Sequence, residues 1–258
     1  MSTLKSRITQ TLLALVAAAT GLRGQEPCSD LLQSLERQLT EQRQTPYDWG
    51  GLIRCGTDNS GRHPPTAKNR VVCFGDQVTD VGYRGSADSF SGQSRLNPGV
   101  AGQTTDQVLI RFRRDVIDLY NKVAVNLVGV IDVALFDGTS IEEMILDSLM
   151  SISGIAPATR IRVVLASGRP VCSCFTKSTA FQRWQEPIPE VNELIQKHCA
   201  DGGAVYLEYD SAMADGNNLK QELTSESLLP NNTGCGVMAL LAEEAVAVSA
   251  QMRPKRCQ

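Results

Sequence analysis

Apolar residues along this chain of 258 residues form two kinds of pattern. Short and nearly continuous apolar runs are typical of strands that are covered on both faces of a sheet. Such runs occur at residues 71–74, 123–128, 161–166 and 205–209, and a shorter strand is expected just before Asn97. The pattern therefore predicts a sheet that begins at about Arg70.

The segments between these runs have apolar residues at helical spacing. The first predicted helix starts at Thr104, a good capping residue, and the last runs over about 236–248. The faces of the three internal helices are formed by Phe112, Val116 and Leu119; by Ile141, Met144, Ile145, Leu149 and Ile152; and by Ile188, Val191, Leu194, Ile195 and Cys199. Strands that alternate with helices predict a parallel, doubly wound sheet.

Four turns follow the predicted strands: residues 75–77, 97–99, 129–132 and 167–170. In a doubly wound sheet, ligands bind beyond the carboxyl ends of the strands. We therefore expect these turns to meet at one edge and to outline a site.

Composition excludes several classes of function. The net charge of −3, the pI near 5.5 and the 5% of aromatic residues argue against a nucleic-acid binder. Only two histidines, His63 and His198, accompany eight cysteines that form no CxxC pair, so we predict no metal and no cofactor. Cys73, in the middle of a predicted strand, is interpreted as a small core residue, whereas disulfide pairing stays open.

The N-terminus has the pattern of a secretory signal peptide over residues 1–24. Lys5 and Arg7 precede an apolar run at 12–19, which is too short for a stable membrane anchor. The eight cysteines fit an oxidising compartment, so we expect a secreted or periplasmic protein. We expect no later segment to be long enough and apolar enough to be transmembrane.

The rest of the chain divides into three predicted parts. Residues 25–69 hold an amphipathic helix at 28–44 and an irregular approach segment. Residues 70–250 form the α/β domain, and residues 251–258 form a polar tail.

Four blocks in this domain resemble the SGNH (GDSL-type) hydrolases, a family of esterases, lipases and carbohydrate deacetylases. The blocks are GDQVTDVG at 75–82, NPGVAGQTT at 97–105, VGVIDVA at 128–134 and TSESLLPN at 224–231. The segment DWGGL at 48–52 also resembles a leader that precedes the first block in many secreted bacterial members. The resemblance implies a three-layer α/β/α (flavodoxin-like) fold with a roughly five-stranded parallel sheet.

In that family a serine attacks an ester, a histidine takes its proton and an aspartate orients the histidine. The resemblance places Gln77 at the serine, Glu226 at the aspartate and Leu229 at the histidine. Of the oxyanion-hole donors, the second-block glycine is present as Gly102, but Ile131 stands at the asparagine.

Asp76 and Asp132 are also present in the matching blocks, where they are interpreted as residues that stabilise turns. Together with Gln77, Gly102 and Glu226 they are the candidate binding residues. Asp76 with Glu226 could support general acid–base catalysis, but a turn carboxylate and a surface carboxylate are the favoured interpretation, and no base is placed to activate Thr79.

The resemblance implies a small-molecule ester or an acylated carbohydrate as ligand. The favoured hypothesis is a catalytically impaired, ligand-binding pseudoenzyme. An active esterase or deacetylase with an unorthodox site, and a structural or interaction module, stay open as alternatives.

Overall fold

The computed structural model describes residues 48–52, 70–82, 95–135, 140–170, 187–202, 204–216, 218–224 and 229–252. The predicted signal peptide, the predicted helix at 28–44, His63 and Glu226 lie outside these residues. The tail at 251–258 is described only to Met252.

The domain is built on a parallel sheet of five strands in the order β2-β1-β3-β4-β5. The strands are β1 (Val71–Gly75), β2 (Arg95–Leu96), β3 (Val123–Leu127), β4 (Arg162–Ala166) and β5 (Val205–Leu207). Every residue of β1 and β3 is buried, which explains their continuous apolar runs. The predicted number of strands and their parallel arrangement are confirmed.

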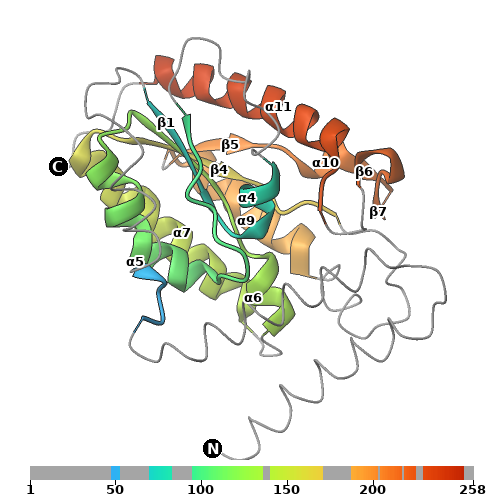
Figure 1. Ribbon diagram of the computed structural model, residues 1–258, viewed down its shortest axis with the longest axis horizontal. Helices are drawn as coiled ribbons and strands as arrows, with labels where there is room; N and C mark the ends of the chain where they lie inside the picture. Colours follow the sequence, from blue (N-terminus) through green and yellow to red (C-terminus); the bar gives the residue numbers. More distant parts are fainter. Residues whose placement is uncertain are drawn as a thin grey trace, which may run out of the picture.

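Helices cover both faces of this sheet, as Figure 1 shows. One face is packed by α5 (Thr105–Asp115), α7 (Ile141–Ile155) and α9 (Pro187–Ala200). The other face is packed by α11 (Asn232–Gln251), which contacts β3, β4, β5 and α4 (Gln77–Gly82). The three-layer α/β/α arrangement predicted above is therefore confirmed.

Two segments that we expected to be turns are helical. The polar segment after Asp76 is α4, and residues 129–132 lead into α6 (Val130–Leu135). β1 ends at Gly75 (φ 158°), and β3 ends two residues before Gly129 (φ 121°). After these two glycines with positive φ, the chain enters α4 and α6 respectively. Polar residues after a strand therefore occur both in loops and at the start of short helices, and the sequence did not show which was present here.

Two element ends also differ from the prediction. β5 ends at Leu207 rather than at residue 209, because the backbone N–H groups of Tyr209 and Asp210 donate to Ser167 Oγ instead of to a neighbouring strand. α11 begins at Asn232 rather than at Gly236, because Asn231 caps it by accepting a hydrogen bond from the backbone N–H of Gly234.

α11 corrects a further expectation. Among the described residues it is one helix that is long and apolar enough to cross a membrane, although we expected no such segment. The helix packs on the sheet through Met238, Ala242, Ala245 and Val246, which are buried in the core. Its apolar composition therefore has an explanation within the folded domain.

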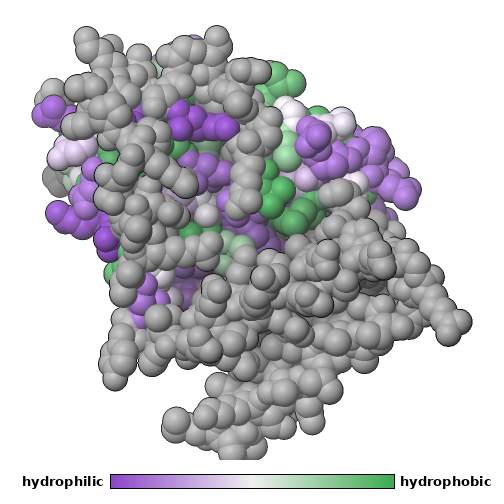
Figure 2. Space-filling view, viewed as in Figure 1, coloured by the Kyte–Doolittle hydropathy of each residue, from purple (hydrophilic) through white to green (hydrophobic). Residues whose placement is uncertain are grey.

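A small hairpin lies beside the end of the sheet that carries the turns. α10 (Asp210–Met213) leads into the antiparallel pair β6 (Ala214–Asp215) and β7 (Asn218–Leu219). The surface over this hairpin is mainly polar in the space-filling view (Figure 2).

Candidate functional site

The site is built on the junction of β1 and α4. Gly75 ends β1 so close to β3 that a Cβ atom there would lie 2.0 Å from the carbonyl oxygen of Leu127. Gln77 is the first residue of α4, and only 5% of its surface is exposed. The side chain at the position that the resemblance gives to the serine is therefore buried at the carboxyl end of the central strands.

Asp76, between these two residues, is fully buried. Its Oδ1 accepts a hydrogen bond of 2.8 Å from the backbone N–H of Val78, which agrees with the predicted role in stabilising the local backbone. Burial raises the pKa of Asp76 to about 7, and the nearby Asp132 adds to this effect while the Val78 hydrogen bond opposes it. The other oxygen, Oδ2, has no hydrogen-bond partner among the described residues.

The hydroxyl of Thr79 is already engaged. It donates a hydrogen bond of 2.9 Å to the carbonyl oxygen of Leu127, and the residue is fully buried. Thr79 therefore ties α4 to β3 and does not face the site as a free hydroxyl.

The second block packs directly on α4. Asn97 Nδ2 donates to the carbonyl oxygens of Thr79 and Asp80 at 3.1 and 3.0 Å. Gly99 lies so close to α4 that an added Cβ would be 2.5 Å from the backbone nitrogen of Asp80. Gly102 follows in the left-handed region, at φ 78°, which explains a glycine at this position.

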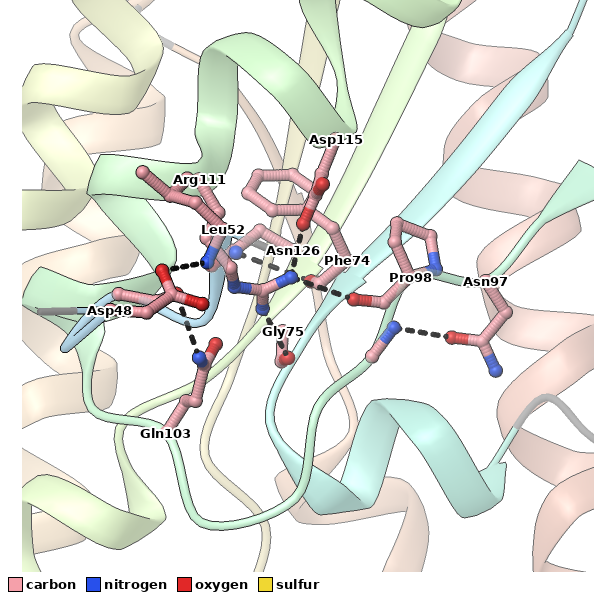
Figure 3. Close-up of polar contacts among 12 residues, drawn as sticks. Asp48, Leu52, Phe74, Gly75, Asn97, Pro98, Gln103, Arg111, Asp115 and Asn126 are labelled. Atoms are coloured by element: carbon pink, nitrogen blue, oxygen red, sulfur yellow. Dashed lines mark hydrogen bonds and ion pairs between the residues drawn. The ribbon is translucent and has the colours of Figure 1, made fainter. Parts of the chain in front are cut away.

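A buried arginine on α5 holds these pieces together. Arg111 donates to the carbonyl oxygens of Pro98 and Gly75 at 3.1 and 3.3 Å and forms an ion pair with Asp115 (Figure 3). Both side chains are 1% exposed. Arg111 thus fixes the second block against the end of β1, a role that the sequence reasoning missed.

The signal for this arginine was present in the sequence. Arg111 and Asp115 are spaced four apart, on the same helical face as the apolar Val108 and Phe112. Opposite charges at that spacing on a buried face indicate a buried ion pair.

The segment 48–52 packs on the same helix. Gln107 Nε2 donates to the carbonyl oxygen of Trp49 at 2.8 Å, and Gln103 Nε2 donates to that of Gly50 at 3.0 Å. Within the segment, Leu52 N–H donates to Asp48 Oδ1. The leader-like residues therefore lie against the α5 side of the second block (Figure 3).

The third block contributes two residues with different positions. Ile131 is partly buried in the first turn of α6. Asp132 is fully buried and accepts hydrogen bonds from Thr105 N (3.0 Å) and Thr105 Oγ1 (2.7 Å). Burial raises the pKa of Asp132 to about 6, although the Thr105 hydrogen bonds oppose the shift.

The contacts of Asp132 extend its predicted role. It accepts a hydrogen bond from its own backbone N–H, and it also anchors the start of α5, a separate element. Sequence could not show this because Thr105 lies far from Asp132 along the chain.

The fourth block is described only in part, since Glu226 lies outside the described residues. Leu229 is partly buried and its carbonyl oxygen accepts a hydrogen bond of 2.8 Å from Thr224 Oγ1. Cys235, in the first turns of α11, lies with its Sγ 3.6 Å from the carbonyl oxygen of Val81 and 3.8 Å from that of Pro230. This thiol places the segment that carries Leu229 beside α4.

One further charged residue, missed by the sequence reasoning, lies at the same edge. Arg169 follows β4 and is only 2% exposed. Burial lowers its pKa to about 10, while the nearby Asp76 and Cys235 act in the opposite direction, so the guanidinium stays charged at neutral pH. The turn 167–170 had been recognised, but its arginine had not been considered as a site residue.

His198 lies away from this edge, as predicted. Its Nε2 is 2.7 Å from Ser153 Oγ, which joins α9 to α7 on one helical layer. Cys73 is fully buried in β1, which confirms its interpretation as a core residue. Cys73, Cys199 and Cys235, the cysteines among the described residues, are free thiols.

Solved structures share this architecture. A protein from Bacteroides fragilis that is described as an acylhydrolase is 25% identical, with a TM-score of 0.70 over 79% of this chain and 99% of its own. A GDSL-like lipase from Bacteroides thetaiotaomicron is also 25% identical, with a TM-score of 0.68 over 78% of this chain and 99% of its own. By its fold, this chain is similar to the SGNH hydrolases.

The SGNH fold extends to more distant proteins. A variant of an acetyl-xylooligosaccharide esterase from a Geobacillus species is 12% identical, with a TM-score of 0.54 over 74% of this chain and 98% of its own, a likeness of fold alone. No family model and no curated protein sequence matches the chain. The relationship to the SGNH hydrolases is therefore carried by the tertiary structure and by the four short blocks.

Proposed function

We propose that this SGNH-fold protein binds a small-molecule ester or an acylated carbohydrate without cleaving it. The observation that carries the proposal is the buried position of Gln77 at the head of α4, beyond the carboxyl end of β1. The four-block resemblance puts the family's nucleophilic serine at this residue.

The chemistry of the side chains supports this proposal. The nitrogen of a carboxamide is a poor nucleophile because its lone pair is delocalised into the carbonyl. Thr79, the nearest hydroxyl along the chain, is bonded to Leu127 O. Ile131 has no group that donates a hydrogen bond, and Leu229 has none that accepts a proton.

The expected loss of turnover is large. Removal of a triad costs on the order of 10⁶ in turnover and leaves roughly 10³ to 10⁴ over the reaction in water. Loss of one oxyanion donor costs about 10² to 10³ more. Little activity above background is therefore expected.

The same scaffold supports a binding role. Gln77 offers both an amide donor and an acceptor, and Asp76 and Asp132 lie nearby. Esters and acetylated sugars are the ligand class of esterases with this fold, such as the acetyl-xylooligosaccharide esterase named above.

We also propose that the protein is secreted or periplasmic. The support is the pattern at 1–24, in which Lys5 and Arg7 precede an apolar run. N-terminal sequencing of protein recovered outside the cytoplasm should give a mature chain that begins near Gln25. A chain that retains Met1 would contradict this.

The test of the binding function is hydrolysis of a p-nitrophenyl ester and of an acetylated sugar by the mature protein. We expect rates equal to those of a heat-inactivated control. The matched variant carries Gln77→Ser, Ile131→Asn, Glu226→Asp and Leu229→His, and turnover by this variant alone would show that the scaffold is intact.

The same assay separates the alternatives. Turnover by the natural protein that survives Gln77→Ala would overturn the proposal. If that turnover were lost on Asp76→Asn, the carboxylate would belong to an unorthodox catalytic site. If the natural protein neither hydrolyses nor binds these compounds in calorimetry, a structural or interaction role would replace the ligand-binding one.

A further inference from the structure

Two buried charged groups at the sheet edge have unused hydrogen-bonding atoms. Arg169 Nε and Nη1 have no hydrogen-bond partner among the described residues, and neither has Asp76 Oδ2. Arg169 is 2% exposed and Asp76 is fully buried. Burial of polar groups in this state is unfavourable, so each of these atoms is expected to have a partner when the protein is in use.

The two residues come from separate elements. Asp76 lies between β1 and α4, whereas Arg169 follows β4, and β3 lies between these strands. They are close enough for each charge to influence the ionisation of the other. Among the described residues, however, they form neither a hydrogen bond nor an ion pair within 4.0 Å.

These unused atoms lie next to the position of the lost nucleophile. Asp76 immediately precedes Gln77, and the charge of Arg169 also acts on Cys235, in the first turns of α11. The segment with Leu229 enters this helix. Arg169 thus lies near the segment that carries Gln77, at the family's serine position, and near the segment that carries Leu229, at its histidine position.

We propose that Arg169 binds a carboxylate group at this edge, beside Gln77, so that the ester or acylated carbohydrate that this protein binds also carries a free carboxylate. The inference rests on the proposed function, because it specifies the ligand class of the same site.

The donors and acceptors favour a carboxylate over a neutral ester. An arginine N–H bonded to a carboxylate makes a charge-assisted hydrogen bond, which is about twice as strong as one between neutral groups. A carboxylate oxygen can accept such a hydrogen bond from Nε or from Nη1 of Arg169, and the carboxylate neutralises the buried charge.

The charge of the site also favours a monoanion. Asp76 lies beside the guanidinium, and an ionised Asp76 would repel a dianion such as phosphate more strongly than a singly charged ligand. With its pKa raised to about 7 by burial, Asp76 is protonated in a large part of the molecules near neutral pH and then offers an O–H donor to the ligand.

The test is isothermal titration of the mature protein with sodium butyrate, butyramide and inorganic phosphate. We expect butyrate to bind at least about tenfold more tightly than butyramide, which has nearly the same shape but no charge. Arg169→Met should remove this preference. Arg162→Met, an arginine at the opposite end of the same strand β4, is the matched control and should preserve it.

Several results would overturn the inference. Equal affinity for butyrate and butyramide, no binding of butyrate, or butyrate binding unchanged in Arg169→Met would each do so. Phosphate binding tighter than that of butyrate would assign the arginine to a phosphate ligand instead. Should Arg169→Met fail to fold, Arg169→Lys, which keeps the charge, and the butyrate–butyramide comparison on the natural protein still decide the question.

Failure of this inference is distinguishable from failure of the proposed function. Ester turnover by the natural protein would refute the absence of catalysis, whatever butyrate does. A silent protein that binds neutral esters but not butyrate would keep the proposed function and refute the carboxylate site.

Discussion

Replacing Arg111 with methionine should destabilise the domain severely. The substitution keeps a long apolar side chain but leaves the carboxylate of Asp115, which is 1% exposed, without its arginine. It also removes the donor to the carbonyl oxygens of Pro98 and Gly75. Breaking a buried ion pair by removing one partner costs about 3–5 kcal/mol, a large share of the roughly 5–15 kcal/mol by which domains are stable.

The assay is urea unfolding followed by far-UV circular dichroism. Arg113→Met on the same helix is the matched control, because Arg113 is 82% exposed and lies 4.0 Å from Asp118. Its cost should stay within about 0.5 kcal/mol. The double variant Arg111→Met with Asp115→Leu should be more stable than Arg111→Met alone, since the uncompensated buried charge is gone.

The reasoning would be refuted by an Arg111→Met protein whose free energy of unfolding falls no further than that of Arg113→Met. It would be weakened equally by a double variant that is less stable than the single one. In the first case the hydrogen bonds from Arg111 to the carbonyl oxygens of Gly75 and Pro98 would not contribute to stability.

Two further predictions concern a glycine and a carboxyl group. Gly75→Ala should lower the unfolding midpoint strongly, since its Cβ would lie 2.0 Å from Leu127 O. Gly154→Ala, whose Cβ would lie in open space on α7, should raise the free energy of unfolding by about 0.5–1 kcal/mol. Equal effects of the two substitutions in urea unfolding would refute the steric argument. Burial raises the folded-state pKa of Asp76 to about 7, above its ordinary value of 3.8, so the folded state holds an extra proton between these values. The stability that this group contributes is present below about pH 4 and is lost as the pH rises through about 7. The unfolding midpoint should therefore fall between about pH 5 and about pH 8, and Asp76→Asn should reduce that fall; an identical pH dependence in the variant would contradict the assignment.

Much of the sheet could be predicted because its signal is local. A strand covered on both faces needs apolar side chains at consecutive positions, so β1 and β3 are visible as runs. Helix faces are visible for the same reason, as at Ile145, Leu149 and Ile152 of α7, all buried. The element ends were less certain, because they depend on single contacts such as that of Ser167 Oγ with Tyr209 N.

The site was predicted in outline and missed in two charged residues. The resemblance placed four blocks at one edge, and the structure brings the first and second together through Asn97 and Gly99. Arg111 and Arg169 were not recognised, because a charged residue in a sequence is most often exposed. Only the packing of α5 and of the turn after β4 shows that both are buried.

By itself, the sequence determined the alternation of strands and helices, the edge at which the turns meet and the absence of a serine at residue 77 in the first block. These follow from side-chain identity and local periodicity. The tertiary structure alone decided that Asp132 anchors α5 and that Arg169 and Asp76 lie near each other with unused hydrogen-bonding atoms. The environment of a buried charge is set by groups from distant parts of the chain, and these come together only when the sheet and its helices have packed.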